Sequence, residues 1–294
     1  MTSGGARRRL DTELVRRQLA PSRQDARAAI ESGSVLVSGA PADKPARLVA
    51  PGEPIVVLGP PSPFVGRGGR KLEAALERFD VAVEGCTALD AGASTGGFTD
   101  CLLQRGAARV YAVDVGHGQL DPSLRGDARV TVFERTNVRT LSVATLRAGD
   151  PAFEPCPVVV GDLSFISLRT VVPALCGEVA APGADLVLLV KPQFEAGRAA
   201  VSRGKGVVRD PAEWRGALEG VASALVSAGT GIMGAMASPL TGASGNVEFL
   251  LHARKGAAGG SGSGSDAEVA ALLTAAVSEA EDRLAAAAAA EPAG

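Results

Sequence analysis

The chain is organised around residues 87–98, which read Thr87-Ala88-Leu89-Asp90-Ala91-Gly92-Ala93-Ser94-Thr95-Gly96-Gly97-Phe98. A short apolar run ends in a carboxylate, a stretch of small residues follows, and an apolar helix start comes next. The three glycines let the backbone approach a ligand closely and adopt positive φ angles. The N–H groups that open a helix suit polar or anionic ligand groups. The stretch therefore predicts a nucleotide-type cofactor site at the end of a central parallel strand.

Length and charge set the frame for this site. The 294 residues, 46% of them hydrophobic, suffice for one large domain or two smaller ones. The net charge of −2 hides an asymmetry, because residues 1–71 hold 12 Lys/Arg against 6 Asp/Glu. A basic first part on an acidic body indicates contact with a polyanion, and a merely solvated charged face is the alternative.

Composition also excludes several classes of protein. The four cysteines show no CxxC spacing and predict neither a zinc site nor a disulfide framework, so a reducing, cytoplasmic setting is expected. With two histidines we expect no metal. Arg7-Arg8-Arg9 leads into an amphipathic segment rather than an apolar one, unlike a signal peptide. No apolar run reaches about 18 residues, so no membrane span is predicted.

Residues 7–59 are predicted to form a small α+β domain. Leu10, Leu14 and Leu19 fall at helical spacing, and Ser22 is placed to cap a second helix that ends at Gly33. The patterns R-L-D-x-x-L-V (9–15), S-R-x-x-A-x-x-x-I (22–30) and G-x-V-x-V-x-G (33–39) resemble the S4 RNA-binding domain.

The S4 resemblance implies a set of basic side chains that contact RNA phosphates, some of which would only solubilise the domain. These candidates are Arg9, Arg16, Arg17, Arg23, Arg27 and Lys44. The segment has no aromatic platform for stacked bases, so recognition of a folded RNA by shape and phosphates is favoured. Residues 60–66 follow as a stiff, Pro-rich linker. The basic stretch after it adds Arg67 and Arg70 as candidate RNA contacts and carries Lys71 at a helix start, where a cation is electrostatically unfavourable.

Residues 67–255 are predicted to form an α/β domain. Continuous apolar runs at 110–113, 130–132, 158–162, 186–191 and 247–251 alternate with helical stretches such as 212–226. This alternation predicts a buried, doubly wound parallel sheet. Asp114 ends the second strand, 24 residues after Asp90. An acidic residue in that place binds ribose hydroxyls in such folds.

Two cofactor classes compete for the glycine loop. A dinucleotide fingerprint would read G-x-G-x-x-G, whereas this loop reads D-A-G-x-x-x-G-G with the acid first. The second pattern resembles class I S-adenosylmethionine (SAM) methyltransferases, whose fold is Rossmann-like. The resemblance implies SAM as cofactor. The residues it assigns to cofactor binding are Asp90, Gly92, Ser94, Thr95, Gly96, Gly97, Phe98, Asp114, Asn137 and Asp162.

Further motifs resemble the TlyA family, which joins an S4 domain to an FtsJ/RrmJ-like 2′-O-ribose methyltransferase. They are the glycine loop, Asp114-Val-Gly-His-Gly-Gln-Leu, Glu134-Arg-Thr-Asn137, Asp162-Leu-Ser-Phe-Ile-Ser, Lys191-Pro-Gln-Phe-Glu and Ser244-Gly-Asn-Val-Glu248. The resemblance implies methylation of cytidine ribose in ribosomal RNA, and some members were first described as haemolysins. It also implies a catalytic tetrad at Lys71, Asp162, Lys191 and Glu248.

A mechanism follows from this tetrad. A ribose 2′-hydroxyl is a weak nucleophile and the sulfonium a good leaving group, so alignment and proton removal are what the enzyme must supply. Lys191 would activate the hydroxyl, with the like charge of Lys71 favouring its neutral amine. Asp162 would orient Lys191, and Glu248 would hold Lys71 or the ribose. Taken singly, Asp162 could be a helix cap, and Lys191 and Glu248 solvated strand residues.

Two other functions fit the sequence less well. A membrane-active haemolysin is disfavoured because the sequence has no strongly amphipathic basic segment. An S4-type RNA-binding protein with an inactive transferase domain is disfavoured by the intact tetrad and glycine loop. Residues 256–294 comprise a Gly/Ser-rich linker and an Ala-rich segment with a thin apolar stripe, expected to be a solvated extension.

Overall fold

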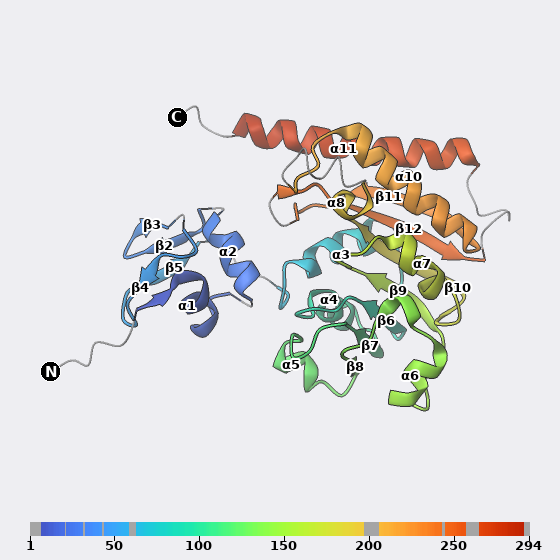
Figure 1. Ribbon diagram of the computed structural model, residues 1–294, viewed down its shortest axis with the longest axis horizontal. Coiled ribbons are helices and arrows are strands. Elements are labelled where there is room, and N and C mark those ends of the chain that lie inside the picture. The colour runs from blue at the N-terminus through green and yellow to red at the C-terminus, as the bar shows by residue number, and fades with distance from the viewer. Residues whose placement is uncertain are drawn as a thin grey trace. The chain divides into compact units, whose positions relative to one another are not determined.

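The computed structural model describes residues 7–20, 22–31, 33–42, 44–58, 63–196, 206–242, 245–256 and 265–290. The chain divides into two compact units, Met1–Arg67 and Gly68–Gly294. Residues 60–62 of the predicted linker lie outside the described residues, as do Gly59, Ser244 and the Gly/Ser-rich residues 257–264. Figure 1 shows the two units.

The first unit packs two helices on short strands. Its elements are β1 (Arg8–Arg9), α1 (Leu10–Arg16), α2 (Arg23–Glu31), β2 (Val35–Val37), β3 (Ala40–Pro41), β4 (Leu48–Val49) and β5 (Ile55–Val57). β1 pairs with β4, and β2 lies between β3 and β5. Leu10, Leu14 and Ile30 are fully buried in its core, which is the helical stripe expected from their spacing. Ser22 caps α2, since its Oγ accepts the Asp25 N–H and donates to the Asp25 carboxylate.

The first helix is shorter than predicted. α1 ends at Arg16, because the chain reverses at Gln18, whose φ is +56°. Leu19, expected on the buried stripe, is consequently 37% exposed. The two-residue strands β1, β3 and β4 were not predicted, since a pair of residues carries no readable alternation.

The second unit is a seven-stranded sheet between helices. Its elements are α3 (Gly68–Arg78), β6 (Thr87–Ala91), α4 (Gly97–Gln104), β7 (Arg109–Val113), α5 (Pro122–Arg125), β8 (Val130–Phe133), η1 (Val138–Thr140), α6 (Val143–Gly149), β9 (Cys156–Gly161), α7 (Leu168–Cys176), β10 (Ala180–Val190), α8 (Pro192–Glu195), α10 (Pro211–Ser227), β11 (Thr230–Ala237), β12 (Phe249–Lys255) and α11 (Asp266–Ala290). The strand order is β11-β12-β10-β9-β6-β7-β8.

The α/β class and the doubly wound arrangement are confirmed, but the prediction of a purely parallel sheet is wrong. β10, β9, β6, β7 and β8 run parallel, whereas β12 runs antiparallel to both β10 and β11. Strand direction depends on how the connections cross the sheet, and an apolar run looks the same in either direction.

β11 was missed altogether. Its sequence, Thr-Gly-Ile-Met-Gly-Ala-Met-Ala, is rich in residues with low strand propensity. Gly234 is required by packing, because a Cβ there would lie 2.7 Å from the Phe79 ring. The tertiary contact therefore sets the residue, and local propensity is overridden.

The Ala-rich segment is part of the folded unit, contrary to the expected solvated extension. α11 packs along α10 and β11 (Figure 1), and Leu273, Ala276, Val277 and Ala280 join the main core. Two of its side chains also hold the end of β11. Glu279 accepts the Ala237 N–H at 3.2 Å, and Arg283 donates to the Ser238 carbonyl at 3.0 Å.

Candidate active site and RNA-binding surface

Three residues of the predicted tetrad, Asp162, Lys191 and Glu248, lie at the same end of neighbouring strands of the sheet. Asp162 follows β9 and Lys191 follows β10, two neighbouring parallel strands. β12 is antiparallel, with Phe249 opposite Val190, so Glu248 precedes β12 at the same edge. Carboxyl ends of parallel strands are where such sheets bind ligands.

The tetrad is arranged as two ion pairs. Lys71 Nζ in the first turn of α3 donates to Glu248 Oε2 at 2.5 Å. Lys191 Nζ lies 2.6 Å from Asp162 Oδ1 and directs its hydrogen bond to Ser164 Oγ at 2.7 Å. Both lysines are buried, at 7% and 9% exposure. Each cation therefore has its own carboxylate.

The start of α3 lies beside Asp162. A Cβ at Gly68, one turn before Lys71, would be 3.6 Å from Asp162 Oδ2 and 3.4 Å from the Phe98 ring. This small residue thus brings the helix that carries Lys71 up to the loop that carries Asp162.

The glycine loop needs its glycines. Gly92 has φ +86°, and a Cβ there would lie 2.7 Å from the Asp162 carbonyl oxygen. Gly96 has φ +104° at the N-cap of α4, and Gly97 opens that helix. A side chain at Gly92 would therefore clash with the backbone of the neighbouring strand end and strain the loop.

Asp90 is a buried carboxylate on this loop. Its exposure is 0%, and its Oδ2 accepts the Thr99 hydroxyl at 2.6 Å. Its Oδ1 has no hydrogen-bond partner among the described residues. Burial raises the pKa of Asp90 to about 7, against the opposing effect of the Thr99 hydrogen bond and with help from the charge of Asp162. A buried acceptor without a partner fits a ligand donor, such as an amino group.

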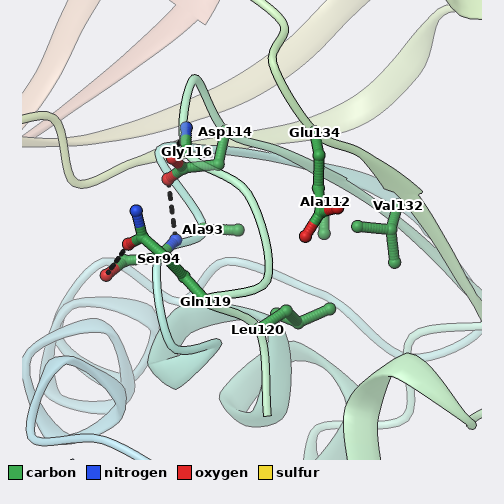
Figure 2. Close-up of a pocket in the computed structure, with 9 residues that line it drawn as sticks. All are labelled: Ala93, Ser94, Ala112, Asp114, Gly116, Gln119, Leu120, Val132 and Glu134. Carbon is green, nitrogen blue, oxygen red and sulfur yellow. Dashed lines mark hydrogen bonds between the residues drawn. The ribbon is translucent and has the colours of Figure 1, made fainter. Parts of the chain in front are cut away.

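A pocket opens at the end of β7 (Figure 2). It is lined by Ala93, Ser94, Ala112, Asp114, Gly116, Gln119, Leu120, Val132 and Glu134. Asp114 Oδ2 accepts the Ser94 N–H at 2.9 Å, and its Oδ1 accepts the Gly116 N–H at 2.6 Å. These bonds fix the carboxylate at the pocket wall, where its remaining lone pairs suit hydroxyl donors.

Glu134 on the opposite wall holds the loop that closes this pocket. It accepts hydrogen bonds from Arg125, the Gly118 N–H and His117. The Arg125 guanidinium, followed by the Gly118 N–H, lowers the pKa of Glu134 to about 2. Neither Glu134 nor Gln119 was assigned a role from sequence, although both lie in the motifs that carry the family resemblance.

Of the ten residues assigned to the cofactor, Ser94 and Asp114 line this pocket and the other eight do not. Asn137 and Thr95 are engaged in other contacts. Asn137 is exposed, and its Oδ1 caps η1 by accepting the Arg139 N–H. The Thr95 carbonyl oxygen accepts a hydrogen bond from the Asp121 N–H. The assignment of all ten residues to the cofactor remains a prediction.

An aromatic pair stands next to Lys191. Phe165 is 91% exposed and has φ +64°, a rare backbone conformation for a bulky residue. Its ring centroid lies 5.2 Å from that of Phe194 in α8. The sequence gives no sign of a role for Phe165, since neither exposure nor φ is visible in a sequence.

Glu195 ties together the loops that carry Asp162 and Lys191. Its side chain is 2% exposed, and its two oxygens accept from the Leu168 N–H and the Ser167 hydroxyl, each at 2.5 Å. Arg169 Nε completes the set at 3.2 Å. α8 is thereby fastened to the start of α7, and sequence reasoning did not identify this contact.

In the first unit, the arginines predicted to bind RNA gather on two buried carboxylates. Arg9, Arg23 and Arg27 contact Asp11, and Arg16 and Arg17 contact Glu13. Lys44 and Arg70 are exposed, and Arg67 is half-buried.

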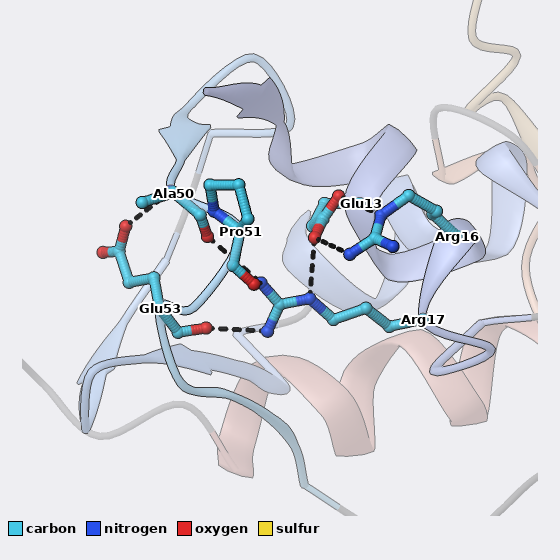
Figure 3. A network of polar contacts seen from close by, with 6 residues as sticks. All are labelled: Glu13, Arg16, Arg17, Ala50, Pro51 and Glu53. Atoms are coloured by element: carbon cyan, nitrogen blue, oxygen red, sulfur yellow. Dashed lines mark hydrogen bonds and ion pairs between the residues drawn. The ribbon is translucent and has the colours of Figure 1, made fainter. Parts of the chain in front are cut away.

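Arg17 differs from the other arginines (Figure 3). Its Nε donates to Glu13, and its Nη atoms donate to the carbonyls of Ala50, Pro51 and Glu53. With 20% exposure it ties α1 to the loop between β4 and β5, whereas Arg16 is 48% exposed. Its guanidinium is therefore less available to a phosphate than those of its neighbours.

The described ranges contain neither a membrane-spanning helix nor a cluster of metal-binding side chains. No helix there combines the length and the apolar character that crossing a membrane requires. Nor do those ranges contain three or more His, Cys, Asp or Glu side chains grouped to hold a metal ion.

Two protein families match the chain. The FtsJ-like methyltransferase family matches residues 64–255, and the S4 domain matches residues 8–55. These matches coincide with the sheet that carries the tetrad and with the unit that carries the arginines.

Full-length relatives share both parts. The chain is 51% identical over 249 residues to the 16S/23S rRNA (cytidine-2′-O)-methyltransferase TlyA of Mycobacterium tuberculosis, covering 84% of this chain and 90% of that protein. It is 38% identical to Hemolysin A of Brachyspira hyodysenteriae, covering 83% and 98%. A solved structure from Streptococcus thermophilus, described under a haemolysin name, aligns with a TM-score of 0.73 at 36% identity, covering 95% and 98%.

Proposed function

This chain belongs to the TlyA family of FtsJ-like methyltransferases with an S4 domain, and we propose that it methylates the 2′-hydroxyl of a cytidine ribose in ribosomal RNA, using SAM. The observation that carries the proposal is a set of two ion pairs at the ends of the strands beside the glycine loop. Lys71–Glu248 is buried, and Lys191–Asp162 joins a buried lysine to a carboxylate that is 23% exposed. Buried ion pairs are weak contributors to stability, so their presence at a ligand-binding edge supports a chemical role.

The residues around the glycine loop fit SAM. Asp114 presents a fixed carboxylate to the pocket and would hold the ribose hydroxyls. Asp90 offers a buried acceptor without a partner, suited to the amino group of the methionine part. When bound, SAM supplies a methyl group on a sulfonium, an activated donor.

The tetrad then has to orient the acceptor and move one proton. Lys191, an ammonium in its ion pair with Asp162 at 2.6 Å, would first release one proton to solvent. The amine would then take the proton of the 2′-hydroxyl, and Asp162 would stabilise the ammonium that forms again. Lys71 and Glu248 make a neutral pair. Lys71 is thus not the unbalanced charge expected from sequence, and we assign the pair to holding the ribose in line.

Phe165 extends this site towards the base. An aromatic ring that is 91% exposed and next to the Lys191–Ser164 contact offers a face on which an unstacked base can lie. The φ of +64° costs about 1–3 kcal/mol, a cost that persists where the surroundings fix the conformation, often for function.

The test is transfer of tritiated methyl from SAM to separated small and large ribosomal subunits that lack the modification. Wild-type protein is expected to label at least one subunit, with the label mapping to a cytidine ribose. Lys191→Ala is expected to reduce transfer by about 10²–10⁴-fold, with SAM binding by calorimetry unchanged.

Lys255 provides the matched control. It ends β12 at the opposite end of the strand from Glu248 and donates to the carbonyls of Gly177 and Ala180. Lys255→Ala should keep methyl transfer. Near-normal transfer by Lys191→Ala would refute the role of Lys191, and no transfer by the wild-type protein to either subunit would refute the function.

A further inference from the structure

One buried carboxylate in the first unit organises three arginines. Asp11 in α1 is 0% exposed. Arg9 reaches both its oxygens at 3.0 Å, Arg23 Nη2 reaches Oδ2 at 3.0 Å, and Arg27 Nε reaches Oδ2 at 3.3 Å. We call Arg9, Arg23 and Arg27 the Asp11 triad. The triad joins β1 to one face of α2, since Arg23 and Arg27 are four residues apart in that helix.

The triad faces outward while its anchor is hidden. The side chains of Arg9, Arg23 and Arg27 remain 41%, 56% and 53% exposed. Burial alone would raise the pKa of Asp11, but the hydrogen bonds from the three arginines hold it well below its usual range. One permanent negative charge thus balances one of three positive charges, and a net positive surface is left.

Without Asp11 these arginines would separate. Like-charged guanidinium groups repel each other, and each long side chain regains rotamer freedom when it is released. A cluster that is held together before the ligand arrives loses less entropy on binding, so preorganisation raises affinity.

We propose that Asp11 is a positioning residue for RNA binding: it prebuilds the Asp11 triad as a site for RNA phosphates. Arginine forks pair with phosphate oxygens in a directed, often bidentate way, so the placement of the three forks matters as well as their charge. The inference rests on the proposed function, because RNA is the polyanion that function supplies.

The proposal and simple electrostatics predict opposite signs for one variant. Asp11→Asn removes a negative charge, so the domain becomes more positive, and charge alone would tighten RNA binding. An amide, however, offers one acceptor oxygen, and its NH₂ group would face guanidinium donors. If Asp11 positions the triad, Asp11→Asn must weaken binding.

The experiment measures binding of the full-length protein to deproteinised ribosomal RNA by filter binding at several salt concentrations. Asp11→Asn is expected to lower the affinity about tenfold and to reduce the slope of log K against log[salt], which counts phosphate contacts at about 0.9 each. Glu31→Gln is the matched control, because it neutralises an exposed acid at the end of α2. It should bind as tightly as wild type or more tightly.

Asp11→Asn binding as tightly as Glu31→Gln, or an unchanged salt slope, would overturn the proposal. If thermal unfolding shows that Asp11→Asn does not fold, Arg23→Gln and Arg27→Gln are compared with Lys44→Gln, which removes an equal charge from an exposed side chain outside the triad. The triad variants should each cost more affinity, and equal costs would overturn the proposal. Because binding is measured without methyl transfer, failure here is distinct from failure of the proposed function.

Discussion

Asp11 and Asp90 are both completely buried, yet their surroundings put them in opposite states. Asp11 has three arginines, which outweigh its burial and hold its pKa far below the usual range. Asp90 accepts a threonine hydroxyl and contacts no cation among the described residues, and its burial raises its pKa to about 7. Burial alone therefore does not set the charge of a carboxylate in this protein; the presence of a cation does.

Contacts between buried carboxylates and cations recur in both units of the molecule. A lysine or arginine contacts each of the buried carboxylates of Asp11, Glu248 and Glu195. In the first unit the cations point outward from the buried anion, which suits binding of a polyanion. At the sheet edge the cations Lys71 and Lys191 are themselves buried, which suits chemistry on one bound group.

The largest effect is expected from turning a paired carboxylate into an unpaired one. Lys71→Met leaves Glu248 buried without its cation. Breaking one partner of a buried pair costs about 3–5 kcal/mol of stability, and we expect methyl transfer to fall by about 10²-fold or more, as for a positioned catalytic group. Thermal unfolding and tritium transfer measure the two effects.

The double variant Lys71→Met/Glu248→Leu separates stability from chemistry. An apolar pair of similar volume should recover most of the lost stability, because no uncompensated charge remains. Methyl transfer should stay as low as in the single variant. Recovery of transfer together with stability would show that this pair only supports the fold.

An intermediate effect is expected at Glu195, whose carboxylate is paired with Arg169. Glu195→Gln keeps an acceptor for the Leu168 N–H but loses the charge, so the loops carrying Asp162 and Lys191 are held less firmly. We expect kcat to fall about tenfold, since small misplacement of reacting groups is costly, with KM for SAM unchanged.

The control for Glu195 is Asp210→Asn. Asp210 caps α10 by accepting the Ala212 N–H at 2.9 Å, and it is exposed. Equal losses of kcat in both variants would mean that general destabilisation, rather than positioning of the loops, explains the Glu195 result.

The smallest effect is expected at Asp90, and it is a change in how stability depends on pH. The pKa of Asp90, about 7 in the folded protein against 3.8 for a free aspartate, means that the folded state holds a proton that the unfolded chain has released. Wild-type stability should therefore fall as pH rises from about 4 to about 7. Asp90→Asn removes this dependence.

The measurement is the melting temperature of Asp90→Asn and wild type, without cofactor, from pH 4.5 to 8.5. The variant's advantage should grow with pH and level off above pH 8, at a few degrees if each kcal/mol shifts Tm by about 2–4 °C. SAM binding should weaken several-fold at the same time. A constant difference across the pH range would contradict the raised pKa.

Much of the fold was predictable because its signals are local. The junction at 87–98 marked β6 and α4, and the long apolar runs marked β7 to β10 and β12. Strand direction was not predictable, since β12 and its parallel neighbours have the same apolar character. β11 was not predicted, because its Gly234 is selected by packing against the ring of Phe79, a contact made across about 150 residues of chain.

The candidate site was only partly predictable. Lys71, Asp162, Lys191 and Glu248 came from resemblance, and the structure supplied their arrangement as two pairs. Asp11 could not have been identified as a buried anchor, because a sequence shows an acid among arginines without showing which side chain is hidden. Glu195 and Phe165 escaped for the same reason: their roles depend on burial and on φ.

The helix α11 protects an edge strand of the sheet against self-association of the protein. β11 is one of the two edge strands of the sheet, with β8 at the other edge, and an edge strand can pair with a strand from another molecule. Glu279 and Arg283 occupy backbone groups at its end, while Leu273 and Val277 cover its face. Deleting residues 266–294 should uncover both, so the shortened protein is expected to self-associate in sedimentation experiments and to aggregate on concentration. The Ala-rich helix would then keep the protein soluble by covering β11, the edge strand farther from the glycine loop.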